Sequence, residues 1–429
     1  MKIAAAALLL AVSAAAQAPS APPAPAANAQ ALETFDAAWS IINTTYYDPS
    51  FRGVDWKAVR DELRPEAARA AGGDELRAVI RRMIARLGES HFAVLSQFAE
   101  KSEQPLGDLS GTPGFEVRAS GDALLVTRVD PESPAYESGV RAGQLLTRIR
   151  GTDVSALAAE LPAGVSPQLR GLELWRAASL RLRGPAGSRF PAIFDGEPRV
   201  IERIEEPGAE VLLGNLPPMK LDVESTAVET PAGAAAGVIR FNVWMAGADA
   251  PVADAVHRFR SARGIVLDLR GNPGGLAGML QGISGHFFGE RVALGTMKTR
   301  ERTLTFFANP RLSRPDGTRV EPYRGRVAIL VDGLTGSASE CFAGGMQAVG
   351  RARVFGETTM GQALPASFTR LPNGDTLLHA IADFETADGT RLEGRGVIPD
   401  EPVRVDAATL AGGRDPVLEA ALAWIDRGE

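Results

Sequence analysis

Apolar residues recur every three or four positions between residues 32 and 95, which is the spacing of amphipathic helices packed on one face. The first predicted helix is marked by Phe35, Trp39, Ile42 and Tyr46. A later helix is predicted over residues 74–87, and Gly88 follows it, where a glycine commonly ends a helix. We therefore expect an N-terminal helical domain over residues 32–100.

Strand-like alternation with glycine and proline turns replaces this spacing over residues 105–195. The runs Gly114-Phe115-Glu116-Val117 and Ser138-Gly139-Val140-Arg141-Ala142-Gly143 make this region resemble a PDZ domain. The resemblance implies that a peptide adds to a sheet edge and that Gly114 and Phe115 help to bind its terminal carboxylate. The alternative is a PDZ fold that serves only as a lid or spacer.

Buried strands alternate with helices over residues 200–429, as in α/β folds. Apolar runs at 237–241, 264–269 and 327–332 predict strands inside a sheet. The last of them leads into a run of small residues, so this run is expected at the carboxyl end of a strand. The whole chain is predicted to be a multidomain α/β protein.

Composition adds few constraints. A chain of 429 residues exceeds a single core, and 45% hydrophobic and 23% charged residues are ordinary values for a globular protein. The net charge of −6 provides no basic patch of the kind that nucleic-acid binding needs. Cysteine and histidine do not cluster at metal-ligand spacing, so we expect no metal and no cofactor.

The first residues predict export. Lys2 precedes an apolar run that is too short to span a bilayer, and small residues follow it. We interpret residues 1–16 as a signal peptide, cleaved after Ala16 or alternatively after Ala18, and residues 17–31 as an Ala/Pro-rich linker. We therefore expect a secreted, periplasmic protein without a stable membrane span.

Ser337 is the candidate nucleophile. It lies in the small-residue run 335–339, directly before a predicted helix over residues 340–349. This arrangement exposes a hydroxyl beside the N–H groups of a helix start, although serines in such runs are also common as caps or turns.

Three segments resemble the carboxyl-terminal processing (tail-specific) peptidases: residues 264–275, 335–359 and 393–400. The resemblance implies a crotonase-like (ClpP-type) core and a nucleophilic Ser337. Many members of that family pair the serine with a lysine base, where this chain has Gln362. An amide cannot take a proton from a hydroxyl near neutral pH, so Gln362 either lines the site or is a neutral filler.

His91 is the predicted base, because an imidazole pKa near 6.5 suits proton transfer at neutral pH. Residues 86–92 resemble the serine–histidine segment of the tricorn-type relatives in the same superfamily. That resemblance implies His91 as general base, Ser90 as a supporting hydroxyl and Glu393 as a carboxylate that completes the charge network. His379, in a strand-like run, is the alternative base.

The oxyanion is expected to be stabilised by backbone N–H groups. Ala338 directly follows the candidate nucleophile and supplies one donor. Gly274 or Gly275 supplies the other, because glycine lets a backbone approach a substrate closely.

Together these features predict a secreted serine endopeptidase of the tail-specific type, acting through a Ser337 acyl-enzyme on a peptide or unfolded protein. The PDZ-like domain is expected to capture the C-terminus of that substrate. Two alternatives are left open. One is a non-catalytic peptide- or ligand-binding protein on a peptidase scaffold, which the missing lysine favours, and the other is a hydrolase of non-peptide esters.

Overall fold

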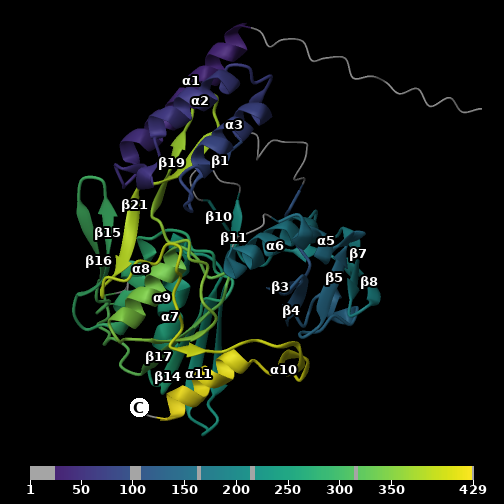
Figure 1. The fold of residues 1–429 in the computed structure, drawn as a ribbon. Coiled ribbons are helices and arrows are strands. Elements are labelled where there is room, and N and C mark those ends of the chain that lie inside the picture. The colour runs from purple at the N-terminus through teal and green to yellow at the C-terminus, as the bar shows by residue number, and fades with distance from the viewer. Residues whose placement is uncertain (1–24, 97–107, 162–165, 213–217, 314–316, 428–429) are drawn as a thin grey trace, which may run out of the picture.

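The computed structural model describes residues 25–96, 108–161, 166–212, 218–313 and 317–427. The chain forms an N-terminal lobe, a middle β domain and a larger α/β core, and the lobe and the middle domain both contact the core (Figure 1). The predicted signal peptide lies outside the described residues. None of the described helices combines the length and the apolar character that crossing a bilayer requires.

The N-terminal lobe is built from two parts of the chain that are far apart in the sequence. Its elements are α1 (Pro25–Thr45), η1 (Phe51–Gly53), α2 (Trp56–Ala67), α3 (Gly73–Ala85), β1 (Ala93–Leu95), β19 (Ala366–Arg370) and β20 (Thr376–Ala380). The strands form an antiparallel sheet in the order β1-β20-β19. Leu364, Leu371 and Leu377 are buried against the helices, so the hairpin β19–β20 completes the core of the lobe.

Two boundaries of this lobe differ from those expected from the sequence. Helix α1 begins at Pro25, inside the stretch 17–31 that the composition predicts to be a linker. Alanines favour a helix, and Ala31 is buried in the core of the lobe, so tertiary packing extends the helix toward the N-terminus. The lobe is also not purely helical, because residues 364–380 lie far away in the sequence and no local pattern connects them to it.

The middle domain is a β sheet with helices packed on it. Its elements are β2 (Gly111–Thr112), β3 (Phe115–Ser120), β4 (Ala123–Val129), α4 (Pro134–Glu137), β5 (Leu145–Ile149), β6 (Thr152–Asp153), α5 (Val154–Ala159), α6 (Pro167–Leu182), β7 (Arg189–Phe194), β8 (Glu197–Glu202) and β9 (Ile204–Glu205). The strand order is β3-β4-β5-β7-β8, so β3 is an edge strand. The domain runs past residue 195, because β9 returns to pair with β2.

The core contains a sheet in the order β12-β13-β14-β17-β18-β22, parallel from β13 onward. The strands of the core, inside and outside this sheet, are β10 (Ala209–Val211), β11 (Met219–Leu221), β12 (Val223–Glu229), β13 (Ala235–Phe241), β14 (Gly264–Asp268), β15 (Val292–Thr299), β16 (Thr303–Ala308), β17 (Arg326–Val331), β18 (Arg353–Gly356), β21 (Ala382–Thr386) and β22 (Glu401–Pro402). Its helices are η2 (Ala246–Ala248), α7 (Asp249–Arg258), α8 (Met279–Ser284), η3 (Gly285–Phe287), α9 (Ala338–Ala348), α10 (Ala407–Ala411) and α11 (Pro416–Arg427).

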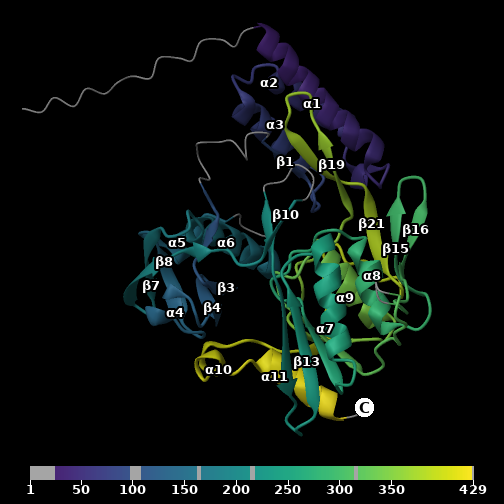
Figure 2. The ribbon, with the colours of Figure 1, turned by 180° about the vertical axis from the view of Figure 1, so that it is seen from behind.

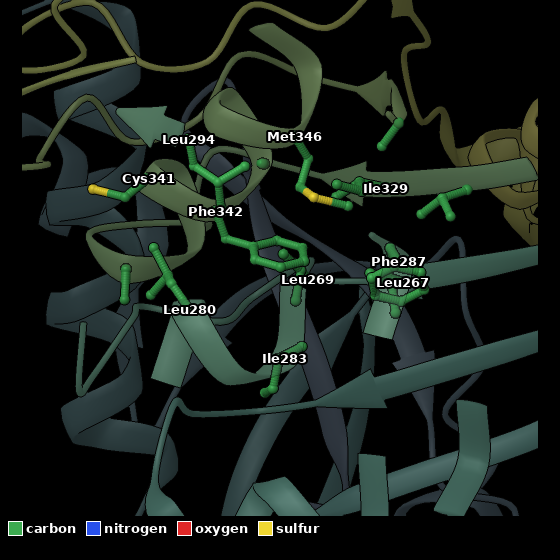
Figure 3. Close-up of a cluster of buried hydrophobic side chains, with 14 of the residues drawn as sticks. Leu267, Leu269, Leu280, Ile283, Phe287, Leu294, Ile329, Cys341, Phe342 and Met346 are labelled. Atoms are coloured by element: carbon green, nitrogen blue, oxygen red, sulfur yellow. The ribbon is translucent and has the colours of Figure 1, made fainter. Parts of the chain in front are cut away.

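Helices cover both faces of this sheet, which explains the continuous apolar runs in the sequence. Helices α7, α8 and α9 pack on one face and α11 packs on the other (Figures 1 and 2). Every residue of β14 is buried. Phe342 and Met346 of α9 lie over Leu267 and Ile329 of the sheet (Figure 3). Burying each of these side chains contributes about 1.5–3 kcal/mol to stability. This packing fixes α9 on the sheet and thereby fixes the position of its N-terminus.

The packing of the sheet brings two loops together. Strands β14 and β17 are parallel neighbours, so the loop after β14 and the loop after β17 leave the same edge of the sheet. The Gly336 N–H donates to the Asn272 carbonyl at 3.0 Å, which joins the two loops directly. Every predicted site residue of the core except Glu393 and Gln362 lies on these loops or at the first turn of α9.

Candidate active site

Ser337 lies in a sharp turn between β17 and α9. Its φ of 51° is in the left-handed region, which costs free energy for a residue with a side chain and persists only where neighbours hold it. The Ser337 N–H donates to the Gln362 carbonyl at 2.9 Å and to Glu340 Oε2 at 3.0 Å. These two hydrogen bonds hold the turn, and the side chain of Ser337 faces the N-terminal lobe.

His91 faces Ser337 across the interface between the lobe and the core. It follows α3 and Gly88, whose φ of 64° lets the chain turn sharply after the helix. His91 Nε2 lies 3.1 Å from Ser337 Oγ, although the two residues are 246 positions apart in the sequence. On the other side of the ring, Nδ1 lies 2.7 Å from Ser90 Oγ.

Glu393 extends this chain of hydrogen bonds. Its carboxylate accepts from the Ser90 hydroxyl at 2.9 Å, from the Ser90 N–H at 2.9 Å and from the Ala363 N–H at 2.8 Å. Because Ser90 Oγ donates to Glu393, it accepts from the imidazole, so the proton of neutral His91 is assigned to Nδ1. His91 Nε2 then has its lone pair directed at the Ser337 hydroxyl. Burial raises the pKa of Glu393.

The electrostatic surroundings keep His91 neutral. Burial and, after it, the positive charge of Arg176 lower the pKa of His91 to about 4. A neutral imidazole in hydrogen-bond contact with a serine hydroxyl is able to accept the proton of that hydroxyl. The arrangement of the three side chains thus has the chemistry needed for nucleophilic attack by Ser337.

The glycines of the loop after β14 lie against the Ser337 turn. A Cβ on Gly274 would stand 2.6 Å from Ser337 Cβ and 2.9 Å from the Ala338 nitrogen, so only glycine fits there. The Gly274 N–H donates to Asn272 Oδ1 at 3.0 Å. Within the part of the chain that the structure describes, the N–H groups of Gly275 and Ala338 have no protein acceptor.

Gln362 accepts hydrogen bonds through both its backbone and its side chain. Its carbonyl receives the Ser337 N–H at 2.9 Å. Its side-chain Oε1 accepts from Arg176 Nη2 of the middle-domain helix α6 at 3.3 Å. Gln362 therefore contacts the candidate nucleophile on one side and the middle domain on the other.

Glu340 is a site residue that the sequence analysis missed. It is completely buried and accepts four hydrogen bonds: from the Thr359 hydroxyl at 2.5 Å and from the backbone N–H groups of Gly361, Gln362 and Ser337 at 2.7, 3.0 and 3.0 Å. Burial raises its pKa to about 7. A glutamate three residues after a serine at a helix start is the spacing of a capping box, and that signal could have identified it.

The other histidines make no hydrogen bond to Ser337 among the described residues, whereas the Cys341 N–H donates to the Ser337 carbonyl at 3.0 Å, one turn into α9. His379, the alternative base, hydrogen-bonds to Thr45 at 3.0 Å and Thr369 at 2.9 Å inside the N-terminal lobe. His257 and His286 line a separate cavity beside α7. Cys341 is buried, its Sγ lies 3.9 Å from the Ala363 carbonyl, and burial holds the pKa of its thiol well above the usual range.

Gly114 and Phe115 line a cavity of about 450 Å³ between the middle domain and the core. Trp175 and Leu182 of α6 form one wall, and Gly271 of the loop after β14 lies on the core side. The edge strand β3 borders this cavity along its first residues.

Two protein-family models match separate parts of the chain. The model of "Peptidase family S41" matches residues 235–403, and that of the "Tricorn protease C1 domain" matches residues 27–85. A carboxyl-terminal-processing protease of Synechocystis sp. is 26% identical over 410 residues, which cover 91% of this chain and 86% of the relative.

Two solved structures share the fold. The photosystem II D1 C-terminal processing protease is 23% identical, with a TM-score of 0.59 over 92% of this chain and 98% of that chain. Mature CPAF complexed with lactacystin is 13% identical, with a TM-score of 0.61 over 94% of this chain and 100% of that chain. The matches in sequence, to the family S41 model over residues 235–403 and to the carboxyl-terminal-processing protease over 91% of the chain, show a serine peptidase of the tail-specific type.

Proposed function

We propose that the chain is a secreted endopeptidase of the tail-specific type in which Ser337 is the nucleophile and His91 the general base. The contact of 3.1 Å between His91 Nε2 and Ser337 Oγ carries this proposal. In the first step, Ser337 Oγ attacks the carbonyl carbon of the scissile bond while its proton moves to Nε2. The imidazolium that forms is stabilised through the Ser90 hydroxyl by the carboxylate of Glu393.

The negative charge on the substrate oxygen needs two donors. Ala338 N–H is one, since it follows the nucleophile at the start of α9. Gly275 N–H is the better second donor, because the Gly274 N–H is already bound to Asn272 Oδ1. His91 then gives its proton to the leaving amine, and a water molecule activated by the same imidazole hydrolyses the acyl-enzyme.

Gln362 takes no part in proton transfer in this mechanism. Its backbone carbonyl holds the Ser337 N–H, and its amide side chain lines the entrance beside Arg176. This interpretation supports a site-lining role for Gln362 over that of a filler.

The middle domain is proposed to be a PDZ domain that captures the C-terminus of a peptide or unfolded protein. Its edge strand β3 offers main-chain groups to an added strand, and α6 forms the opposite wall of the cavity at Gly114 and Phe115. Holding a chain there raises its effective concentration near Ser337. The parallel sheet with α9 is likewise proposed to be a crotonase-like core.

Residues 1–16 are proposed to direct the protein out of the cytoplasm as a signal peptide, and the expected compartment is the periplasm. The apolar run and the small residues after it support this proposal. N-terminal sequencing of the exported protein tests it: a mature chain that begins after Ala16 or Ala18 is expected, and retention of Met1 would contradict it.

The mechanism is tested by peptide hydrolysis with the purified mature protein. Casein and an unstructured protein ending in small apolar residues serve as substrates. Ser337→Ala and His91→Ala are each expected to lower kcat by on the order of 10⁴-fold or more, because the two groups act as a unit. His379→Ala is the matched control and is expected to retain activity, since that ring is bound to Thr45 and Thr369.

Each other outcome has a definite meaning. An active His91→Ala variant would show that another group is the base. Hydrolysis of esters without hydrolysis of peptides would show a different substrate class. Peptide binding without any cutting by the wild type would show that the scaffold only binds.

A further inference from the structure

Glu89, the residue directly before Ser90 and His91, is buried in a cage of donors. Its side chain is 4% exposed. The carboxylate accepts from the hydroxyls of Tyr46 and Tyr47, the latter at 2.8 Å, and from Arg52 Nη1 at 3.1 Å. All of these groups belong to the N-terminal lobe, so Glu89 anchors the histidine-bearing segment within its own lobe.

Arg391 reaches the same carboxylate from the core. Its Nη2 lies 2.8 Å from Glu89 Oε1, and its Nη1 donates to the Glu393 carbonyl at 3.1 Å. Its Nε donates to Asp383 of β21 at 2.5 Å, which fixes the guanidinium to the core. One planar group therefore contacts both the segment that carries His91 and the segment that carries Glu393.

The catalytic groups proposed above come from two lobes, so their distances depend on how the lobes meet. His91 itself has a φ of 59°, a strained conformation that needs support from its neighbours. The Ser90–Glu393 hydrogen bonds hold the residue before His91, but they are part of the site that must be aligned. Glu89 and Arg391 lie outside that site and join the same two segments.

We propose that the Glu89–Arg391 ion pair is a contact that sets the histidine-bearing segment of the N-terminal lobe against the core, so that His91 Nε2 meets Ser337 Oγ. Both are positioning residues, and neither touches the reacting atoms. This inference rests on the proposed role of His91 as base. Removing either partner breaks this link between the two segments, while Arg52 still pairs with Glu89 in the lobe and Asp383 still pairs with Arg391 in the core.

The test uses Arg391→Met, which keeps the apolar stem and removes the charge, and Arg391→Lys, which restores a cation. Arg77→Met is the matched control, because Arg77 also pairs with a buried carboxylate, that of Asp375 at 3.1 Å, between α3 and the hairpin β19–β20. For each variant, kcat, KM, the rate of Ser337 labelling by a fluorophosphonate and the thermal unfolding midpoint are measured.

Arg391→Met is expected to lower kcat by about 10²-fold with KM changed by less than about threefold, because misplacement of a catalytic group by about 1 Å has this effect. The labelling rate should fall in parallel, since labelling needs the same serine–histidine contact. The kcat of Arg391→Lys should be about tenfold higher than that of Arg391→Met. Arg77→Met should lower the unfolding midpoint without changing kcat or labelling.

Wild-type kcat and labelling in Arg391→Met would overturn the inference, as would equal losses in Arg77→Met. If Arg391→Met fails to fold, Glu89→Gln serves instead, because the amide keeps the volume and still accepts from one tyrosine. His91→Ala separates the two proposals. An active His91→Ala protein removes the proposed mechanism, whereas an inactive one beside an unimpaired Arg391→Met removes only this inference.

Discussion

Arg176 Nη2 of the middle domain lies 3.3 Å from the side-chain oxygen of Gln362, at the position where many tail-specific peptidases have a lysine base. A lysine there would bring its ammonium group next to a guanidinium. Two cations in contact disfavour each other's charged form and cost free energy at neutral pH. Glutamine at position 362 is therefore compatible with Arg176, whereas lysine is not.

Gln362→Lys is accordingly expected to lower kcat/KM about tenfold, because a like charge facing Arg176 pushes α6 away from the site. The double variant Gln362→Lys/Arg176→Gln should recover most of this loss. Steady-state hydrolysis of one peptide by the four proteins measures both effects. An increase in activity in Gln362→Lys that survives His91→Ala would show instead that the chain can use a lysine base.

The activity should persist to unusually low pH. A general base acts only while neutral, and burial together with Arg176 lowers the pKa of His91 to about 4 from its ordinary value of 6.5. The acid limb of kcat/KM is therefore expected near pH 4. Arg176→Gln removes a positive charge, so the pKa of His91 should rise and the limb should move toward higher pH.

The matched control for this shift is Arg170→Gln, which removes the same charge from the same helix at an exposed pair with Asp122. The acid limb of kcat/KM for Arg170→Gln should stay at the wild-type pH. Equal shifts in both variants would mean that the net charge of α6, and not the proximity of Arg176, sets the pKa.

The sequence could propose the central residues of the candidate site because they lie in local motifs. Ser337 stands in a run of small residues, and His91 and Glu393 lie in segments with a recognisable order. The contacts between these segments could not be predicted in the same way. Arg391 has no local pattern that directs it to Glu89, and Arg176 lies on a helix of another domain.

The same limit applies to the fold. The spacing of Phe35, Trp39 and Ile42 predicted a helix because one face of that helix is buried in the lobe. The hairpin at residues 366–380 has an ordinary strand pattern, and its place beside α1 depends on packing between distant segments. Periodicity identifies an element, whereas tertiary packing decides what it joins.

Glu340→Gln tests how the Ser337 turn is held. All four partners of Glu340 are donors, so a carboxylate satisfies them, and the NH₂ group of an amide would face two donors. We expect kcat to fall by about 10²-fold through misplacement of Ser337. The unfolding free energy should fall by about 1–3 kcal/mol, because buried donors lose their acceptor. Unchanged kcat with lowered stability would show that Glu340 only supports the fold.

Arg118 connects the edge strand β3 of the middle domain to the core at Asp332, the residue directly after β17. Asp332 Oδ1 in turn accepts from the backbone N–H groups of Gly271 and Leu334, both at 3.0 Å. Although burial raises the pKa of Asp332, Arg118 and these N–H groups hold it below its usual range. One carboxylate thus joins the middle domain to the loop after β14 and to the turn before Ser337.

Arg118→Met should therefore lower kcat by about tenfold or more while changing KM less, because the Ser337 turn and the glycine loop lose a common support. Arg128→Met is the matched control: Arg128 also joins the middle domain to the core, through Glu224 at 2.6 Å, but it does not contact Asp332. Peptide hydrolysis and fluorophosphonate labelling of both variants distinguish the two roles. Equal effects would mean that the contact between domains matters only as a whole, whereas a loss confined to Arg118→Met assigns the effect to the path through Asp332.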